Sequence, residues 1–143
     1  MIYSGYQGIG KSTLARKMPN VIDLESGNFF VDGQRHEDWY KVYANIAKHL
    51  SEQGKIVFVS SHSILRDYMK ESKIPYKVIF PSLNLKSEWT AKLKQRYEET
   101  KKSKDFKAWV NAVECYDRNI TALYYERDKI MIESMDYSLE NLI

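Results

Sequence analysis

The chain contains one cysteine, three prolines and six glycines among its 143 residues. The single Cys115 cannot form an internal disulfide or a metal site built from several cysteines. So little proline and glycine excludes collagen-like and low-complexity chains. No apolar run approaches the roughly 20 residues of a membrane helix, and the first residues do not resemble a secretory signal. We therefore expect a cytoplasmic protein with no membrane partner.

The composition suits one folded domain that spans residues 1–143. Hydrophobic residues make up 43% of the chain and aromatic residues 13%, which argues against disorder. The net charge is +3, but residues 84–107 alone hold eight basic and four acidic side chains. This basic stretch is either a solvated helix face or a lid over a polyanionic ligand.

Apolar runs alternate with amphipathic segments along the chain. Strands are predicted over 1–4, 20–24, 55–59, 76–80 and 129–133, and helices over 11–18, 37–53, 63–72, 85–100 and 104–126. A short helix is expected in the last ten residues, and a loop over 26–36. This order predicts an α/β fold, a three-layer α/β/α arrangement around a mostly parallel five-stranded sheet. Ligands of such sheets bind beyond the carboxyl ends of the strands.

The most specific motif is a glycine-rich loop between the first strand and the first helix. Residues 5–12, GYQGIGKS, fit the pattern G-x-x-x-x-G-K-[ST] at every fixed position. Backbone N–H groups of such a loop surround phosphate oxygens, the lysine reaches the β- and γ-phosphates, and the serine hydroxyl binds Mg²⁺. The cofactors expected are ATP and Mg²⁺. The predicted nucleotide-binding residues are Gly5, Gly8, Ile9, Gly10, Lys11, Ser12 and Thr13.

The chain resembles the nucleoside monophosphate kinase and shikimate kinase group of phosphate-loop proteins. It is most similar to small deoxynucleoside monophosphate kinase-like proteins of bacteriophages. The resemblance rests on Gly5–Ala15, Ile22–Ser26 and Val57–Met69. It implies a phosphate-loop kinase fold with a helical lid over about 84–107, and transfer of the ATP γ-phosphoryl group to a (deoxy)nucleoside monophosphate. We expect a monomer or homodimer with small nucleotide substrates and no stable nucleic-acid binding.

Two carboxylates lie at the carboxyl end of the second predicted strand. Asp23 and Glu25 resemble an element that, in these kinases, orders water on Mg²⁺ or contacts the acceptor. The resemblance therefore implies a metal site at Ser12 and Asp23, and substrate binding by Glu25. The alternative is that both carboxylates cap a turn. The third strand leads into Ser60–His62 without an acidic residue, which disfavours a motor or transport ATPase.

The acceptor side is expected to include Arg35, Trp39, His62 and Arg66. The resemblance implies that Arg66 clamps the acceptor phosphate, and its alternative is a surface salt bridge with a nearby acid such as Asp67 or Glu71. His62 either contacts a phosphate or a base edge of the ligand, or has only a structural role as a capping or packing residue. Phe29, Phe30 and Trp39 either stack a base or seal a helix onto the sheet, and Arg35 offers charge for the phosphate.

The basic stretch is expected to supply cations to the transferring phosphoryl group. Lys92 and Arg96 are four residues apart on one helical face. The related proteins commonly show R-x-x-x-R-G here, whereas this chain has Thr100 and Lys101 after Arg96. The missing second arginine leaves Lys92, Lys101, Lys102 or Arg118 as substitutes.

The predicted function is phosphoryl transfer from ATP, with Lys11, Asp23 and Arg96 as the catalytic residues. A phosphate acceptor needs no strong general base, whereas a hydroxyl acceptor would need Asp23 or Glu25 in that role. Two alternatives remain open: a kinase of a sugar or polynucleotide hydroxyl, and a non-catalytic ATP-binding regulator.

Overall fold

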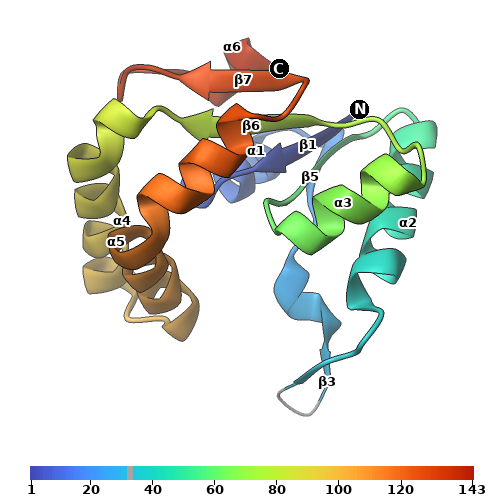
Figure 1. Ribbon diagram of the computed structural model, residues 1–143, viewed down its shortest axis with the longest axis horizontal. Helices are drawn as coiled ribbons and strands as arrows, with labels where there is room; N and C mark the ends of the chain where they lie inside the picture. Colours follow the sequence, from blue (N-terminus) through green and yellow to red (C-terminus); the bar gives the residue numbers. More distant parts are fainter. Residues whose placement is uncertain (32–33) are drawn as a thin grey trace.

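The computed structural model describes residues 1–31 and 34–143 (Figure 1). The strands are β1 (Ile2–Gly5), β2 (Val21–Asp23), β3 (Phe30–Val31), β4 (Gln34–Arg35), β5 (Ile56–Ser60), β6 (Lys77–Pro81) and β7 (Lys129–Ile132). The α-helices are α1 (Lys11–Lys17), α2 (Trp39–Glu52), α3 (Ser63–Glu71), α4 (Lys86–Thr100), α5 (Ser103–Tyr124) and α6 (Leu139–Leu142). Two 3-10 helices, η1 (Ser26–Phe29) and η2 (Leu83–Leu85), complete the elements. Within the described residues, no helix combines the length and apolar character needed to cross a membrane.

The main sheet has five strands in the order β2-β5-β1-β6-β7, and every neighbouring pair is parallel. The central strand β1 aligns Tyr3 with Phe58 of β5 and Ser4 with Val78 of β6. All five strands were predicted from their apolar runs, and their helical connections confirm the three-layer α/β/α fold. The carboxyl ends of β1, β2 and β5 consequently meet at one edge of the sheet.

Two hydrophobic cores cover the sheet. In β5, Phe58 packs with side chains of α1, α4, α5 and α6, whereas its neighbours Val57 and Val59 pack with α2 and α3. This alternation follows from the two-residue period of a strand. Figure 1 shows α4 and α5 as a helical hairpin on one side of the view, with α2 and α3 on the other. The two cores thus hold both groups of helices around the edge of the sheet where β1, β2 and β5 end.

The prediction of a plain loop over 26–36 is wrong. This segment holds η1 and a second, two-stranded antiparallel sheet of β3 and β4 that projects away from the main sheet (Figure 1). Each strand has two residues, which is too short for an alternating hydrophobic pattern to be recognised. The ring of Phe29 anchors the segment, because it packs on Tyr43 of α2 with 4.9 Å between ring centroids.

Candidate functional site

A cleft of about 1010 Å³ opens at the carboxyl ends of β1, β2 and β5. Its walls come from the glycine-rich loop, the segment after β2, the first turn of α3, and one face of α5. Seven of its lining residues are cationic: Lys11, Arg35, Arg66, Arg96, Lys104, Lys107 and Arg118. Three are acidic: Asp23, Glu25 and Asp105. The cleft is therefore suited to an anionic ligand.

The glycine-rich loop has the backbone conformation that its sequence predicts. Gly8 and Gly10 adopt φ values of 87° and 106°, in the left-handed region that favours glycine. A Cβ on Gly5 would lie 2.5 Å from Cδ1 of Ile9, so this position also requires glycine. Gly10 is the N-cap of α1, which directs the positive end of the helix dipole toward the cleft.

Lys11 and Ser12 both line the cleft at the start of α1. The Lys11 ammonium donates a hydrogen bond to the Gly5 carbonyl, with 3.2 Å between Nζ and O. Burial lowers the pKa of Lys11, while the charges of Asp23 and Glu25 act in the opposite direction. The ammonium thus lies between the loop and the two carboxylates, where it can meet a phosphate.

The loop is fastened to the helical hairpin and to the C-terminal segment. Trp89 of α4 donates from Nε1 to the Gln7 carbonyl at 2.9 Å, and Tyr137 donates its hydroxyl hydrogen to the Ile9 carbonyl at 2.8 Å. The Ile9 side chain is only 1% exposed and belongs to the core. Of the predicted nucleotide-binding residues, Ile9 and the exposed Thr13 are not part of the cleft wall. The Ile9 side chain therefore supports the loop from the side of the hydrophobic core.

Asp23, the last residue of β2, and Glu25, two residues beyond it, both line the cleft. Burial raises the pKa of Asp23, partly opposed by the charge of Lys11. Burial alone would also raise the pKa of Glu25, but the hydrogen bond and charge of Lys104 lower it overall. Lys104 Nζ lies 2.9 Å from Glu25 Oε1 and joins this segment to α5 across the cleft.

Ser12 and Asp23 offer the hydroxyl and carboxylate oxygens that Mg²⁺ prefers. Within the described residues, no cluster of three or more histidine, cysteine or acidic side chains could hold a metal by itself. Mg²⁺ in nucleotide enzymes is bound by one or two protein oxygens together with substrate phosphates and water. The residues present therefore fit the predicted ion, with the phosphates as its other ligands.

His62 lies in a hydrogen-bonded network with Arg35, Ser26 and Ser60. Arg35 donates from Nη1 to His62 Nε2 at 3.2 Å and from Nη2 to Ser26 Oγ at 3.2 Å. A guanidinium cannot accept a hydrogen bond, so Nε2 carries the lone pair, and Nδ1 donates to Ser60 Oγ at 2.7 Å. Desolvation in the cleft, followed by the charge of Arg35, lowers the pKa of His62 to about 4. The ring is neutral at pH 7.

The structure does not bring Trp39 to the cleft. The indole is 8% exposed and packs edge-on against Tyr43 and His62. The Arg35 guanidinium covers it, with Cζ 4.4 Å from the ring centroid. Trp39 begins α2, so its side chain joins the core face of that helix. The Phe30 side chain lies outside the described part of the chain.

Arg66 lines the cleft but pairs with neither of the acids suggested by the sequence. Its partner is Glu126, two residues after the end of α5, and both side chains are buried. Arg66 Nε also donates to the Ser61 carbonyl at 3.1 Å. The surface salt bridge expected with Asp67 or Glu71 is therefore a buried ion pair with a residue 60 positions away.

The structure separates Lys92 from Arg96. Arg96 lines the cleft and lies 3.3 Å from the buried Asp105, measured from Nε to Oδ1. Lys92 instead donates to the Tyr137 hydroxyl at 3.2 Å, and its ammonium lies 4.4 Å from the centroid of the Trp89 ring. The Thr100 hydroxyl donates a hydrogen bond to Asp105 Oδ2. This bond stabilises the turn between α4 and α5.

One face of α5 contributes side chains that motif analysis missed. Gln7 Nε2 donates to Asn111 Oδ1 at 2.9 Å, and Asn119 Nδ2 donates to the same oxygen at 3.3 Å. Arg118, considered as a substitute lid cation, lines the same wall, with Lys104 and Lys107 nearer the hairpin tip. Polar residues at 104, 107, 111 and 118 recur at helical spacing, and this signal was available in the sequence.

No protein-family model and no solved structure matches this chain. A 61-residue segment is 34% identical to part of a protein from Polaromonas sp. (strain JS666 / ATCC BAA-500) named ATP-dependent lipid A-core flippase. The match covers 43% of this chain and 9% of that protein. The similarity concerns a segment, and it establishes neither a family nor an activity.

Proposed function

We propose that the protein binds ATP with Mg²⁺ and transfers the γ-phosphoryl group to a small acceptor, a (deoxy)nucleoside monophosphate. One observation carries the proposal: Lys11 and Ser12 of the phosphate loop share a single cleft with Asp23 and Arg96. The partial match to a protein named as ATP-dependent supports ATP as the nucleotide.

The proposed reaction depends on positioning and on neutralising charge. An oxygen of the acceptor phosphate attacks the γ-phosphorus while the bond to the bridging β-oxygen breaks and ADP leaves. The acceptor oxygen is already anionic, so no side chain has to remove a proton. Lys11 and Arg96 stabilise the charge that develops on the transferred group. Ser12 and Asp23 would hold Mg²⁺, which neutralises charge on the donor phosphates when bound.

The acceptor enters from the side of β2, β5 and α3 in this proposal. Arg35 and Arg66 bring positive charge to that part of the cleft, and Arg118 adds a third cation from the α5 wall. Since Arg35 covers Trp39, the acceptor base is held by groups other than the Trp39 face. Positive charge close to the attacking phosphate favours an acceptor that is itself a phosphate ester.

An acceptor screen tests the proposal. The protein is incubated with ATP, Mg²⁺ and each ribo- and deoxynucleoside monophosphate, and the products are identified by mass. We expect ADP and one class of nucleoside diphosphate. The Lys11→Ala variant should lose this activity, whereas Lys17→Ala should keep it, because Lys17 pairs with Glu140 outside the cleft.

The same assay separates the alternatives. ATP binding without transfer to any nucleotide, sugar or oligonucleotide would identify a non-catalytic nucleotide-binding protein. Transfer to a sugar or oligonucleotide hydroxyl alone would replace the proposed acceptor. Normal turnover by Lys11→Ala would overturn the assignment of the phosphate loop.

A further inference from the structure

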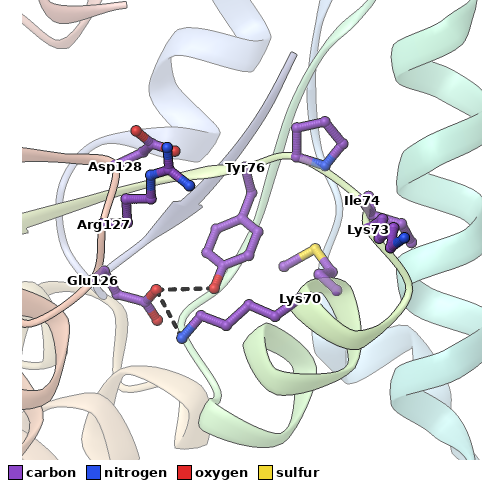
Figure 2. Close-up of a pocket in the computed structure, with 9 residues that line it drawn as sticks. Lys70, Lys73, Ile74, Tyr76, Glu126, Arg127 and Asp128 are labelled. Carbon is purple, nitrogen blue, oxygen red and sulfur yellow. Dashed lines mark hydrogen bonds and ion pairs between the residues drawn. The ribbon is translucent and has the colours of Figure 1, made fainter.

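A buried carboxylate joins the cleft to a second, smaller pocket on the molecule. This pocket, of about 270 Å³, lies between the end of α3, the segment before β6 and the segment that joins α5 to β7 (Figure 2). Lys70 and Tyr76 point at Glu126 from two of its sides (Figure 2). Lys70 Nζ and the Tyr76 hydroxyl each lie 3.0 Å from Glu126 Oε1. The other carboxylate oxygen, Oε2, receives Arg66 from the cleft.

Glu126 is too buried to act on a ligand in the cleft by direct contact. Its side chain is 3% exposed, and three donors already occupy its two oxygens. Arg66 is the one of the three that lines the cleft. Any influence of Glu126 on the reaction therefore passes through the Arg66 guanidinium.

The hydrogen bonds of Arg66 leave one edge of the guanidinium available. Nε donates to the Ser61 carbonyl and Nη1 pairs with Glu126. Within the described residues, Nη2 has no hydrogen-bond partner. Two fixed bonds from different elements hold a planar group in one orientation, and they direct its remaining donors to the cleft.

The charges of the cluster also favour an anion. Arg66 and Lys70 are both positive and share one carboxylate, so the group keeps a net charge of +1. Without Lys70, the negative charge of Glu126 would cancel the positive charge of Arg66. The cleft gains a fixed cation without a buried, unpaired charge.

We propose that Glu126 is a positioning residue that holds Arg66 toward the acceptor, with Lys70 preserving the positive charge of the pair. The role at the acceptor rests on the proposed function. Glu126 makes no contact with substrate in this account. The proposal assigns a functional consequence to a carboxylate and a lysine that lie outside the cleft.

The Glu126→Gln variant separates positioning from simple charge, because the two predict opposite results. Removal of a negative charge beside Arg66 should by itself tighten binding of an anionic acceptor. Loss of the ion pair that orients Arg66 should weaken binding. We expect the acceptor KM to rise about tenfold while the ATP KM stays within about twofold. An unchanged or lower acceptor KM would overturn the proposal.

Asp128→Asn is the matched control. Asp128 lines the same pocket and carries the same charge, but it makes no ion pair with Arg66. It should retain the wild-type acceptor KM. An equal effect of Asp128→Asn and Glu126→Gln would show a general charge effect and contradict positioning.

Lys70→Gln keeps the test decisive if Glu126→Gln fails to fold. The Lys70 side chain is 53% exposed, so its replacement should leave stability nearly unchanged. The acceptor KM should rise about threefold, because the cluster loses its net positive charge. No change in this value would overturn the role assigned to Lys70.

An NMR measurement separates failure of this inference from failure of the proposed function. The Arg66 Nη resonances, whose Nη1 group pairs with Glu126, should be protected from water exchange in the wild type and should shift when inorganic phosphate is added. In Glu126→Gln the protection and the shift should both be lost. If the protein lacks transferase activity but shows this behaviour, positioning is supported and the proposed function fails. If the enzyme is active but its Arg66 Nη resonances are unchanged in Glu126→Gln, positioning is contradicted.

Discussion

Glu25, which follows β2, and Lys104, in the first turn of α5, form an ion pair of 2.9 Å across the mouth of the cleft. The pair joins two elements that are 79 residues apart in the chain. Burial raises the pKa of Asp23, whereas in Glu25 the hydrogen bond and charge of Lys104 outweigh burial and lower the pKa. Asp23 is the one that remains without a cationic partner at ion-pair distance within the described residues.

Lys104→Ala should reverse the pKa shift of Glu25. Burial raises this pKa, and the hydrogen bond and charge of Lys104 outweigh burial in the wild type. Without Lys104, the pKa of Glu25 should rise in a carboxylate NMR titration. Stability should fall by no more than about 1 kcal/mol, because the pair is partly exposed. Lys107→Ala is the control, and an unchanged Glu25 pKa in Lys104→Ala would contradict the account.

Gly8→Ala should destabilise the protein by more than backbone strain alone. Gly8 has φ 87°, and an added Cβ would lie 2.9 Å from Leu93 Cδ2 and 3.2 Å from Trp89 Nε1. Gly54 has a similar φ of 85° with open space around it, so Gly54→Ala measures the strain by itself. We expect about 1 kcal/mol for Gly54→Ala and a further 1–3 kcal/mol, roughly, for Gly8→Ala. Equal losses of unfolding free energy in urea for the two variants would show that α4 shifts to accommodate the added methyl group without cost.

Tyr43→Phe tests whether one hydroxyl aligns two strand ends. Tyr43 donates to the Leu24 carbonyl and accepts from the Ser60 N–H at 3.0 Å. Removal of the hydroxyl leaves both backbone groups without this partner, at a cost of about 1–3 kcal/mol in unfolding free energy. Tyr40→Phe is the control, because the Tyr40 hydroxyl makes no hydrogen bond to any described residue. Similar stability for the two variants would contradict an aligning role for Tyr43.

The sequence predicted the main sheet because the signals involved are local. Each of the five strands is an apolar run bounded by breakers, and the loop of residues 5–12 satisfies a motif with four fixed positions. Asp23 and Glu25 were expected at the crevice from their position at a strand end, and both line the cleft. These inferences needed only neighbours in the chain and the parallel order of the sheet.

The side-chain partners could not be predicted because they come from distant segments. Lys92 and Arg96 have helical spacing, but Tyr137, 45 residues from Lys92, draws that lysine away from the cleft. Arg66 forms an ion pair with Glu126. The guanidinium of Arg35, which belongs to β4, covers the ring of Trp39. Helical periodicity gives the direction of a Cβ, whereas tertiary contacts decide where a long side chain ends.

His62 should remain neutral well below its ordinary titration range. Its pKa is about 4 in the folded protein, against about 6.5 in an unfolded chain. Between these values the unfolded state binds more protons, so stability should fall as pH drops from 6.5 toward 4. His62→Gln should show a shallower pH dependence of urea unfolding. In Arg35→Ala the NMR pKa of His62 should rise, and a His62 pKa near 6.5 in the wild type would refute the network.

Arg96 and Lys92 give the sharpest test of the basic stretch, since one lies in the cleft and the other does not. Under the proposed function, Arg96→Ala should slow phosphoryl transfer by about one to three orders of magnitude, because a cation near the transferred group is worth several kcal/mol in a water-poor site. It should also cost about 1 kcal/mol of stability, as Asp105 is buried and loses an ion-pair partner.

Lys92→Ala should show the reverse pattern, with near-normal turnover and a loss of about 0.5–1 kcal/mol from the contacts with Trp89 and Tyr137. Steady-state kinetics and urea unfolding of both variants measure the two effects separately. A large loss of turnover in Lys92→Ala would mean that the lysine leaves Tyr137 and enters the cleft during the reaction. Full turnover in Arg96→Ala would contradict the role assigned to Arg96 and leave charge stabilisation to the cleft cations of α5, which are Lys104, Lys107 and Arg118.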